Sequence, residues 1–144
     1  MAFVWHNEGK EMVNRVLLQE AGGAWAVPAN YYLGLCNEVM AAVDDLADIS
    51  TELAVALGYA RVAIPSSAVG WPTIVPDGDY SKATSQEVSF TSVGGAWATV
   101  TRGFLCTVAS GTGGKLLASF DIASYALPSG DSWPMTVALS NKGG

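Results

Sequence analysis

The stretch DDLADISTELAVALGYARVAI, residues 44–64, changes its hydrophobic period at Gly58. Before the glycine, acidic residues alternate with apolar ones spaced by three and four, namely Leu46, Ile49 and Leu53. This spacing predicts one or two helical turns, or a lid, lying on the core. After the glycine the apolar residues alternate, and Pro65 has no backbone N–H with which to extend a ladder. We therefore predict a core strand over residues 59–64, preceded by a glycine hinge.

Arg61 is the one charged residue of this predicted strand. On an extended chain its guanidinium lies on the face opposite Val62 and Ile64, just beyond Tyr59. From there it can pair with a carboxylate of segment 44–52 and hold that segment on the sheet. We favour this structural role over ligand binding.

The composition indicates one domain, residues 1–144, that associates with other molecules. Charged residues make up 14% of the chain, against about 25% in a typical domain. Hydrophobic residues make up 50%, the chain has five Trp, and the mean hydropathy is +0.29. Such a surface predicts burial against copies of the chain or against a partner. Gly, Pro and polar residues interrupt every uncharged run, so we expect no membrane span.

Charge and cysteine usage exclude further classes. The net charge of −6 and the scattered basic residues argue against a nucleic-acid-binding surface. Residues 1–10 lack a basic region followed by an apolar run, so no secretion signal is visible. Cys36 and Cys106 lie in separate apolar segments without metal-ligand spacing. We expect two buried free thiols in a reducing cytosol.

The remaining chain reads as one helix followed by strands. Apolar residues Met12, Val13, Val16 and Leu17 share one face of a predicted helix over residues 7–20. A short strand is predicted over residues 31–36, and a long surface loop over residues 65–82, where Pro and Gly are frequent. Alternating patterns then predict strands over residues 87–91, 99–108, 116–122 and 135–139, with turns at 110–114 and 128–131. The predicted fold is mainly β, an antiparallel sandwich or barrel with a short N-terminal helix.

Catalytic and ligand-binding patterns are weak. His6 is the single histidine and lies at the chain terminus, away from any Ser or Cys motif. The acidic residues of segment 44–52 lack the order of an EF-hand loop and suit helix capping instead. Asp77-Gly78-Asp79 reads as a turn. Segment 109–116 has Ala and Leu where a phosphate-binding loop needs Gly and Ser or Thr. We therefore predict no enzyme activity, no cofactor and no metal site.

Several short motifs, in this order, resemble a family of small structural proteins from tailed bacteriophages. They are Leu46-Ala47-Asp48-Ile49 with Glu52, Gly58-Tyr59-Ala60-Arg61, Gly103-Phe104, Leu116-Leu117-Ala118 and Leu127-Pro128-Ser129-Gly130-Asp131. The N-terminal helix leading to Tyr32-Leu33-Gly34-Leu35 also fits the family pattern. The resemblance implies a virion component, assembled in the host cytoplasm, without catalysis or cofactor.

The first expectation from this resemblance is a capsid decoration, or cement, protein that forms a homotrimer and binds the major capsid protein or other virion proteins. The alternative is a tail, neck or fibre-base component. A third possibility is a β-sandwich that binds carbohydrate or a host receptor through exposed Trp side chains, Trp71, Trp97 or Trp133. For Trp71, packing on its own core is the competing interpretation. The structural or interface candidates are Tyr59, Arg61, Trp71, Trp97, Leu105, Leu117 and Trp133.

Overall fold

A computed structural model describes residues 3–19, 22–78 and 80–140. The fold is mainly β, as predicted, with antiparallel sheets and one short N-terminal helix. The largest sheet has five strands in the order β1 (Phe3–Trp5), β8 (Leu116–Tyr125), β7 (Val100–Cys106), β2 (Asn30–Cys36) and β3 (Val62–Pro65). In the described part of the chain the strands do not close into a barrel.

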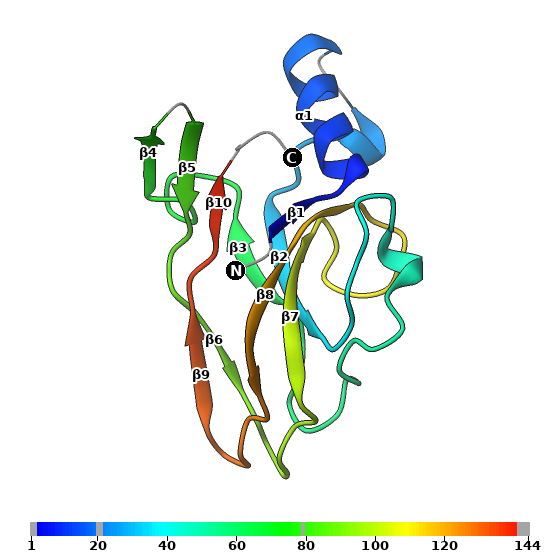
Figure 1. The fold of residues 1–144 in the computed structure, drawn as a ribbon, viewed down its shortest axis with the longest axis vertical. Coiled ribbons are helices and arrows are strands. Elements are labelled where there is room, and N and C mark those ends of the chain that lie inside the picture. The colour runs from blue at the N-terminus through cyan, green and yellow to red at the C-terminus, as the bar shows by residue number, and fades with distance from the viewer. Residues whose placement is uncertain (1–2, 20–21, 79, 141–144) are drawn as a thin grey trace.

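Two smaller antiparallel sheets lie beside the five-stranded sheet (Figure 1). One has the order β10 (Ala138–Ser140), β5 (Tyr80–Thr84) and β4 (Thr73–Asp77). The other pairs β6 (Val88–Thr91) with β9 (Ser132–Met135). Helix α1 (Asn7–Gln19) lies at one end of the molecule, close to β1 and β2 in Figure 1.

The side chains of the five-stranded sheet contribute to two hydrophobic clusters, one on each face. Because successive strand residues point to opposite faces, Leu105 joins the larger cluster while Phe104 and Cys106 join the smaller one. The larger cluster also receives Met12 of α1 and residues of the small sheets. The smaller cluster packs under the acidic segment through Leu46. Segment 44–52 therefore covers one face of the sheet, as its apolar spacing predicts.

Helix α1 packs closely on β8 because Gly9 faces the backbone of Leu117. A Cβ at position 9 would lie 2.4 Å from the Leu117 carbonyl oxygen, so only glycine allows this approach. The predicted helix is confirmed over Asn7–Gln19, and residue 20 lies outside the described residues. In the described part of the chain, no helix has the length and apolar character needed to cross a membrane.

The predicted core strand over residues 59–64 is wrong at its start. Strand β3 begins at Val62, which pairs with Leu33 of β2. Tyr59 and Arg61 precede the ladder, and both side chains are buried. Each side chain hydrogen-bonds to Glu52 of the acidic segment. These bonds fix the position of residues 59–61, which therefore do not pair with β2.

The predicted loop over residues 65–82 is also wrong, because it contains β4 and the start of β5. Pro76 misled the sequence interpretation. It is tolerated because β4 is an edge strand, where a missing N–H breaks no ladder on the outer side. Gly78 has a φ of 63°, which supplies the left-handed turn between the two strands. Of the predicted turn Asp77-Gly78-Asp79, the last residue lies outside the described residues.

The predicted strand over residues 135–139 is divided between two sheets. Met135 ends β9, whereas Ala138 begins β10, which pairs with β5. Between them the backbone N–H of Val137 donates to the hydroxyl of Ser85 at 2.8 Å. That bond replaces a ladder bond and lets the chain cross from one sheet to the other. Strand β1 was not predicted, since three residues are too few to show a period.

Candidate assembly surfaces

Arg61 pairs with Glu52, the partner class predicted from the sequence. Its Nε lies 2.8 Å from Glu52 Oε1 and its Nη2 lies 2.8 Å from Oε2, a two-point contact. The hydrogen bond from Arg61 to Glu52 raises the pKa of the guanidinium. Its remaining N–H groups donate to the carbonyls of Val108 at 3.1 Å and Gly111 at 3.0 Å. One buried side chain thus ties segment 44–52 to the loop between β7 and β8.

Tyr59 completes this network. Its hydroxyl donates to Glu52 Oε1 at 2.9 Å and accepts the backbone N–H of Leu35 at 3.0 Å. Burial is the main cause that raises the pKa of the Tyr59 hydroxyl. The ring stacks on Phe90 and meets the edge of Trp97. Tyr59 and Arg61 therefore act inside the chain.

The carboxylates of the acidic segment cap backbone N–H groups, as predicted. Asp45 accepts from the N–H of Ala47 at 2.7 Å, and Asp48 accepts from that of Asp45 at 2.9 Å. This capping box opens the 3₁₀ turn η2 (Leu46–Asp48), in place of a longer helix. Among the described residues, no group of three or more His, Cys, Asp or Glu is arranged to hold a metal ion.

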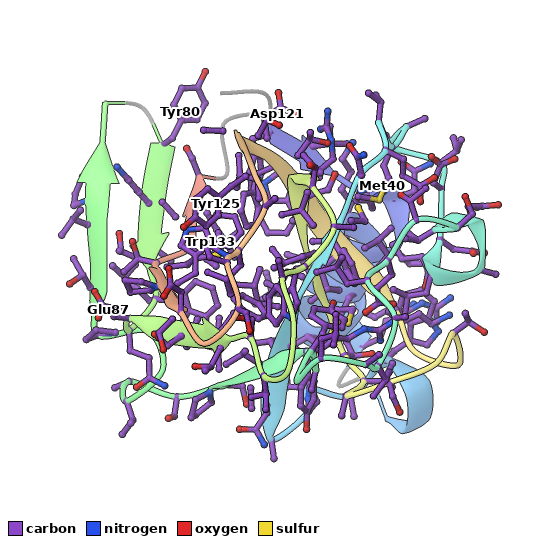
Figure 2. The ribbon with its side chains drawn as sticks, turned by 90° about the horizontal axis from the view of Figure 1, so that it is seen from below. Met40, Tyr80, Glu87, Asp121, Tyr125 and Trp133 are labelled. Carbon is purple, nitrogen blue, oxygen red and sulfur yellow. The ribbon has the colours of Figure 1, made fainter. Side chains whose placement is uncertain are left out.

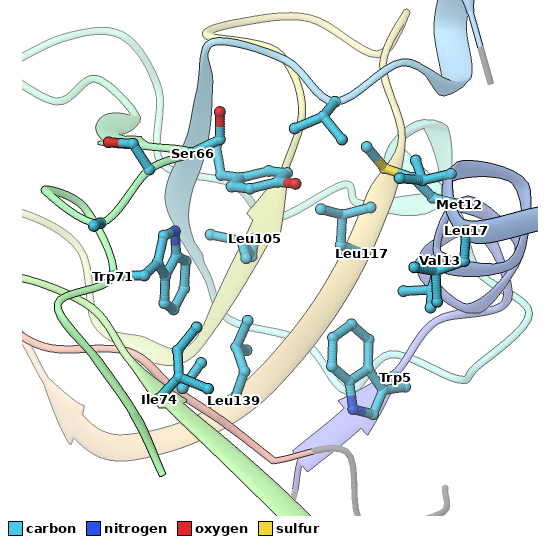
Figure 3. Close-up of a pocket in the computed structure, with 17 residues that line it drawn as sticks. Trp5, Met12, Val13, Leu17, Ser66, Trp71, Ile74, Leu105, Leu117 and Leu139 are labelled. Carbon is cyan, nitrogen blue, oxygen red and sulfur yellow. The ribbon is translucent and has the colours of Figure 1, made fainter. Parts of the chain in front are cut away.

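An apolar groove of about 560 Å³ lies between α1 and the β4–β5 hairpin (Figure 3). Figure 3 shows Met12, Val13 and Leu17 of α1 on one side of it and Trp71, Ile74 and Leu139 on the other. Leu105 and Leu117 lie between the two walls. Charged side chains are missing from its lining among the residues that the structure describes. The groove therefore suits an apolar element.

The sequence matches a family model described as Podophage GP4 fiber I protein gp80, over residues 10–138. The chain belongs to this family. A comparison with curated proteins finds no match. Family membership identifies the chain as a structural protein of a phage virion, which confirms that part of the sequence resemblance. The word fiber in the family description favours the tail or fibre-base alternative over capsid decoration.

In this gp80-family chain, three more of the structural or interface candidates are interior residues, besides Tyr59 and Arg61. Trp97 is only 5% exposed and donates its indole N–H to the Leu57 carbonyl at 2.8 Å. The hypothesis that Trp97 is an exposed stacking platform is therefore wrong. Leu105 and Leu117 are buried in the core and reach the surface only as the floor of the groove.

The other two Trp candidates are partly exposed. Trp71 packs edge-on against Tyr31, with ring centroids 6.5 Å apart, and also lines the groove. It therefore both touches its own core and faces the groove. Trp133 lies beside Tyr125 (Figure 2). Their ring centroids are 4.8 Å apart. The interface roles of Trp71 and Trp133 stay predictions.

Trp133 and Tyr125 belong to a second groove of about 830 Å³ between the end of β8 and the β9–β10 segment. Its lining mixes apolar side chains with hydroxyls, among them Ser124 and Thr136. Compared with the first groove it is larger and more polar. It offers no charged side chain among the described residues.

His6 is buried and forms a pair with Ser119, with 2.9 Å between His6 Nε2 and Ser119 Oγ. Desolvation by burial lowers the pKa of His6. Neither residue lines either groove, so a substrate in a groove does not reach the pair. The pair joins the residue between β1 and α1 to β8 and stabilises the packing there.

Cys36 and Cys106 are buried and unpaired, as predicted. Burial raises the pKa of Cys36 to about 11 and also raises that of Cys106. Thiols with raised pKa values are poor nucleophiles at neutral pH.

The groove was not predicted from the sequence, although one feature of α1 points to it. Its signal is the width of the apolar stripe on α1. Met12 is buried, whereas Val13 and Leu17, assigned to the same face, stay largely exposed. A stripe wider than its own core can cover indicates a second contact surface.

Proposed function

We propose that this chain is a non-enzymatic structural subunit of a podophage tail fibre or fibre base. The observation that carries the proposal is the match to the fiber protein family over residues 10–138. A fibre subunit must hold its shape outside the cell and bind neighbouring subunits repeatedly. Its surface, not a catalytic centre, performs that task.

The use of polar groups supports this role. Arg61, Glu52 and Tyr59 satisfy each other inside the chain. The carboxylates of segment 44–52 bind backbone N–H groups next to them. His6 and Ser119, a pair of the kind used in hydrolases, are buried. These groups stabilise the fold and leave the apolar surfaces as the features offered to other molecules.

The proposed partners are copies of the chain and other virion proteins, met during assembly in the host cytoplasm. Reduced, buried Cys36 and Cys106 suit that compartment. Only 14% of the residues are charged, which reduces the free-energy cost of desolvating charges when subunits come into contact.

Labelling of intact virions with gold-conjugated antibody against the folded chain tests the proposal. We expect label along the fibres or at the single vertex that carries the tail. Virions that lack the gene provide the matched control and should lose the fibre while keeping a filled head. Label spread over the whole head surface would overturn the proposal in favour of capsid decoration.

A further inference from the structure

At the groove between α1 and the β4–β5 hairpin, exposed apolar side chains project from the walls on either side of an apolar hollow. Leu17 is 75% exposed on the helix side, and Ile74 is 67% exposed on the hairpin side. The floor between them is formed by buried Leu105 and Leu117. A face that carries both an apolar projection and an apolar hollow can bind the same face of another copy.

We propose that this groove receives helix α1 of a second copy of the chain. The exposed apolar area is of the size that such a contact needs. Full burial of a Val, Leu or Ile side chain removes roughly 60–120 Å² of apolar surface. Six apolar residues at the groove are about half to four fifths exposed. Val13, Leu17, Val27 and Ile74 line the groove, and Leu18 and Val69 are sequence neighbours of lining residues.

Together these six side chains present roughly 230–460 Å² of apolar surface per copy. A stable interface of standard size buries about 800 Å² per partner, and in homodimers about two thirds of the interface is apolar. The six side chains therefore supply roughly two fifths to nine tenths of the apolar area, about 530 Å², that one such interface requires. Polar and backbone atoms at the edge of the groove supply the rest.

The charges of α1 allow two copies to approach at this face. The helix carries two acidic and two basic residues, so its formal charge is zero while the whole chain has −6. Glu11 pairs with Arg15 at 2.7 Å, and Glu8 pairs with Lys115 at 3.2 Å. Four of the acidic residues lie instead in segment 44–52. Copies that meet through α1 therefore bring together helices of zero formal charge whose carboxylates are already paired, and they keep the acidic segments apart, which favours a second copy as the occupant.

Sedimentation velocity of the full chain over a range of concentrations tests the proposal. We expect the native chain to associate reversibly and Leu17→Glu and Ile74→Glu each to weaken association at least tenfold. The matched controls are Val39→Glu and Val55→Glu, at positions 82% and 84% exposed outside the groove. Glu is a good helix former, so Leu17→Glu should keep the helical circular dichroism of α1.

Cysteine cross-linking locates the contact. A mixture of Leu17→Cys and Ile74→Cys chains should form a mixed disulfide-linked dimer under mild oxidation, whereas Leu17→Cys with Val55→Cys should not. A native chain that stays monomeric at all concentrations would overturn the proposal. The proposal would also be overturned if the control substitutions weakened association as much as the groove substitutions do. It would likewise be overturned if the chain bound only another virion protein through this groove and not a second copy of itself.

Discussion

The Arg61 network and the apolar groove differ in how their atoms find partners. Around Arg61, each guanidinium nitrogen has an acceptor within the chain, and Glu52 binds both Arg61 and Tyr59. In the groove, Leu17 and Ile74 project into water without covering residues. A satisfied polar network has nothing left to offer a partner, whereas exposed apolar surface gains free energy only when another molecule covers it. The comparison assigns the first region to folding and the second to assembly.

The largest effect should follow from Arg61→Met. This change leaves Glu52 without its cation and two loop carbonyls without a donor. Breaking a buried ion pair from one side costs about 3–5 kcal/mol, and the lower end applies because Glu52 keeps some access to water. We expect the free energy of unfolding in urea to fall by about 3 kcal/mol. The matched control is Glu11→Ala, which removes an exposed pair worth under about 0.5 kcal/mol and leaves the contact of Arg15 with the Trp25 ring in place.

Equal losses in the two variants would show that the buried network contributes no more than a surface ion pair. The claim that the Arg61 network stabilises the fold would then be wrong. Self-association of Arg61→Met, measured where the variant is still folded, should match that of the native chain.

A smaller effect should follow from Gly9→Ala, at the boundary of the two regions. Alanine in place of glycine usually stabilises a helix by about 1 kcal/mol. Here the added Cβ meets the Leu117 carbonyl oxygen at 2.4 Å, so α1 must move away from β8. We expect the overpacking cost of about 1–3 kcal/mol to exceed this gain, so that thermal unfolding shows a net loss of up to about 2 kcal/mol.

Gly113→Ala is the control for this substitution, since nothing lies within 4 Å of its Cβ position. Its stability should change by less than about 0.5 kcal/mol. Because Gly9 also lines the groove, Gly9→Ala should weaken self-association as well. A stabilised Gly9→Ala chain would mean that α1 is not held against β8 as described.

The smallest effect is the pH dependence of stability that comes from the buried side chain of His6. Burial lowers the pKa of His6, while the nearby Asp44 acts to raise it and Arg102 to lower it. The unfolded chain therefore binds a proton near pH 6.5, and the folded chain binds it only at lower pH. Stability should fall as the pH drops below 6.5 and level off below the folded pKa.

Urea unfolding of the native chain and of His6→Gln between pH 7.5 and 5 measures this effect, because the variant lacks the titrating group. We expect a shallower pH dependence in His6→Gln over that range. Identical slopes in the two chains would contradict the assignment of His6 as a buried neutral histidine.

The sequence predicted the parts of the fold that local patterns determine. Helix α1, strand β2 and the Arg61 partner in segment 44–52 follow from spacing and from the need to neutralise a buried cation. The β4–β5 hairpin was missed because Pro76 suggests a loop unless the strand is known to be an edge. That knowledge comes only from the sheet order.

The candidate surfaces were less predictable than the fold. Trp97 and Leu105 were candidates for either a structural or an interface role, and long-range packing buries both. Conversely, Leu17 was expected on the packed face of α1 and stays in water. Exposure depends on which distant strands cover a side chain, and alternation along one segment does not encode that.

A reconstruction of the intact virion by electron cryomicroscopy, with this chain traced in the density, tests the central claim most directly. We predict that the chain lies in the tail fibre or its base and that α1 of a neighbouring copy fills the groove beside Leu17 and Ile74. A chain traced on the capsid surface, with that groove open to solvent, would contradict both the location and the mode of assembly.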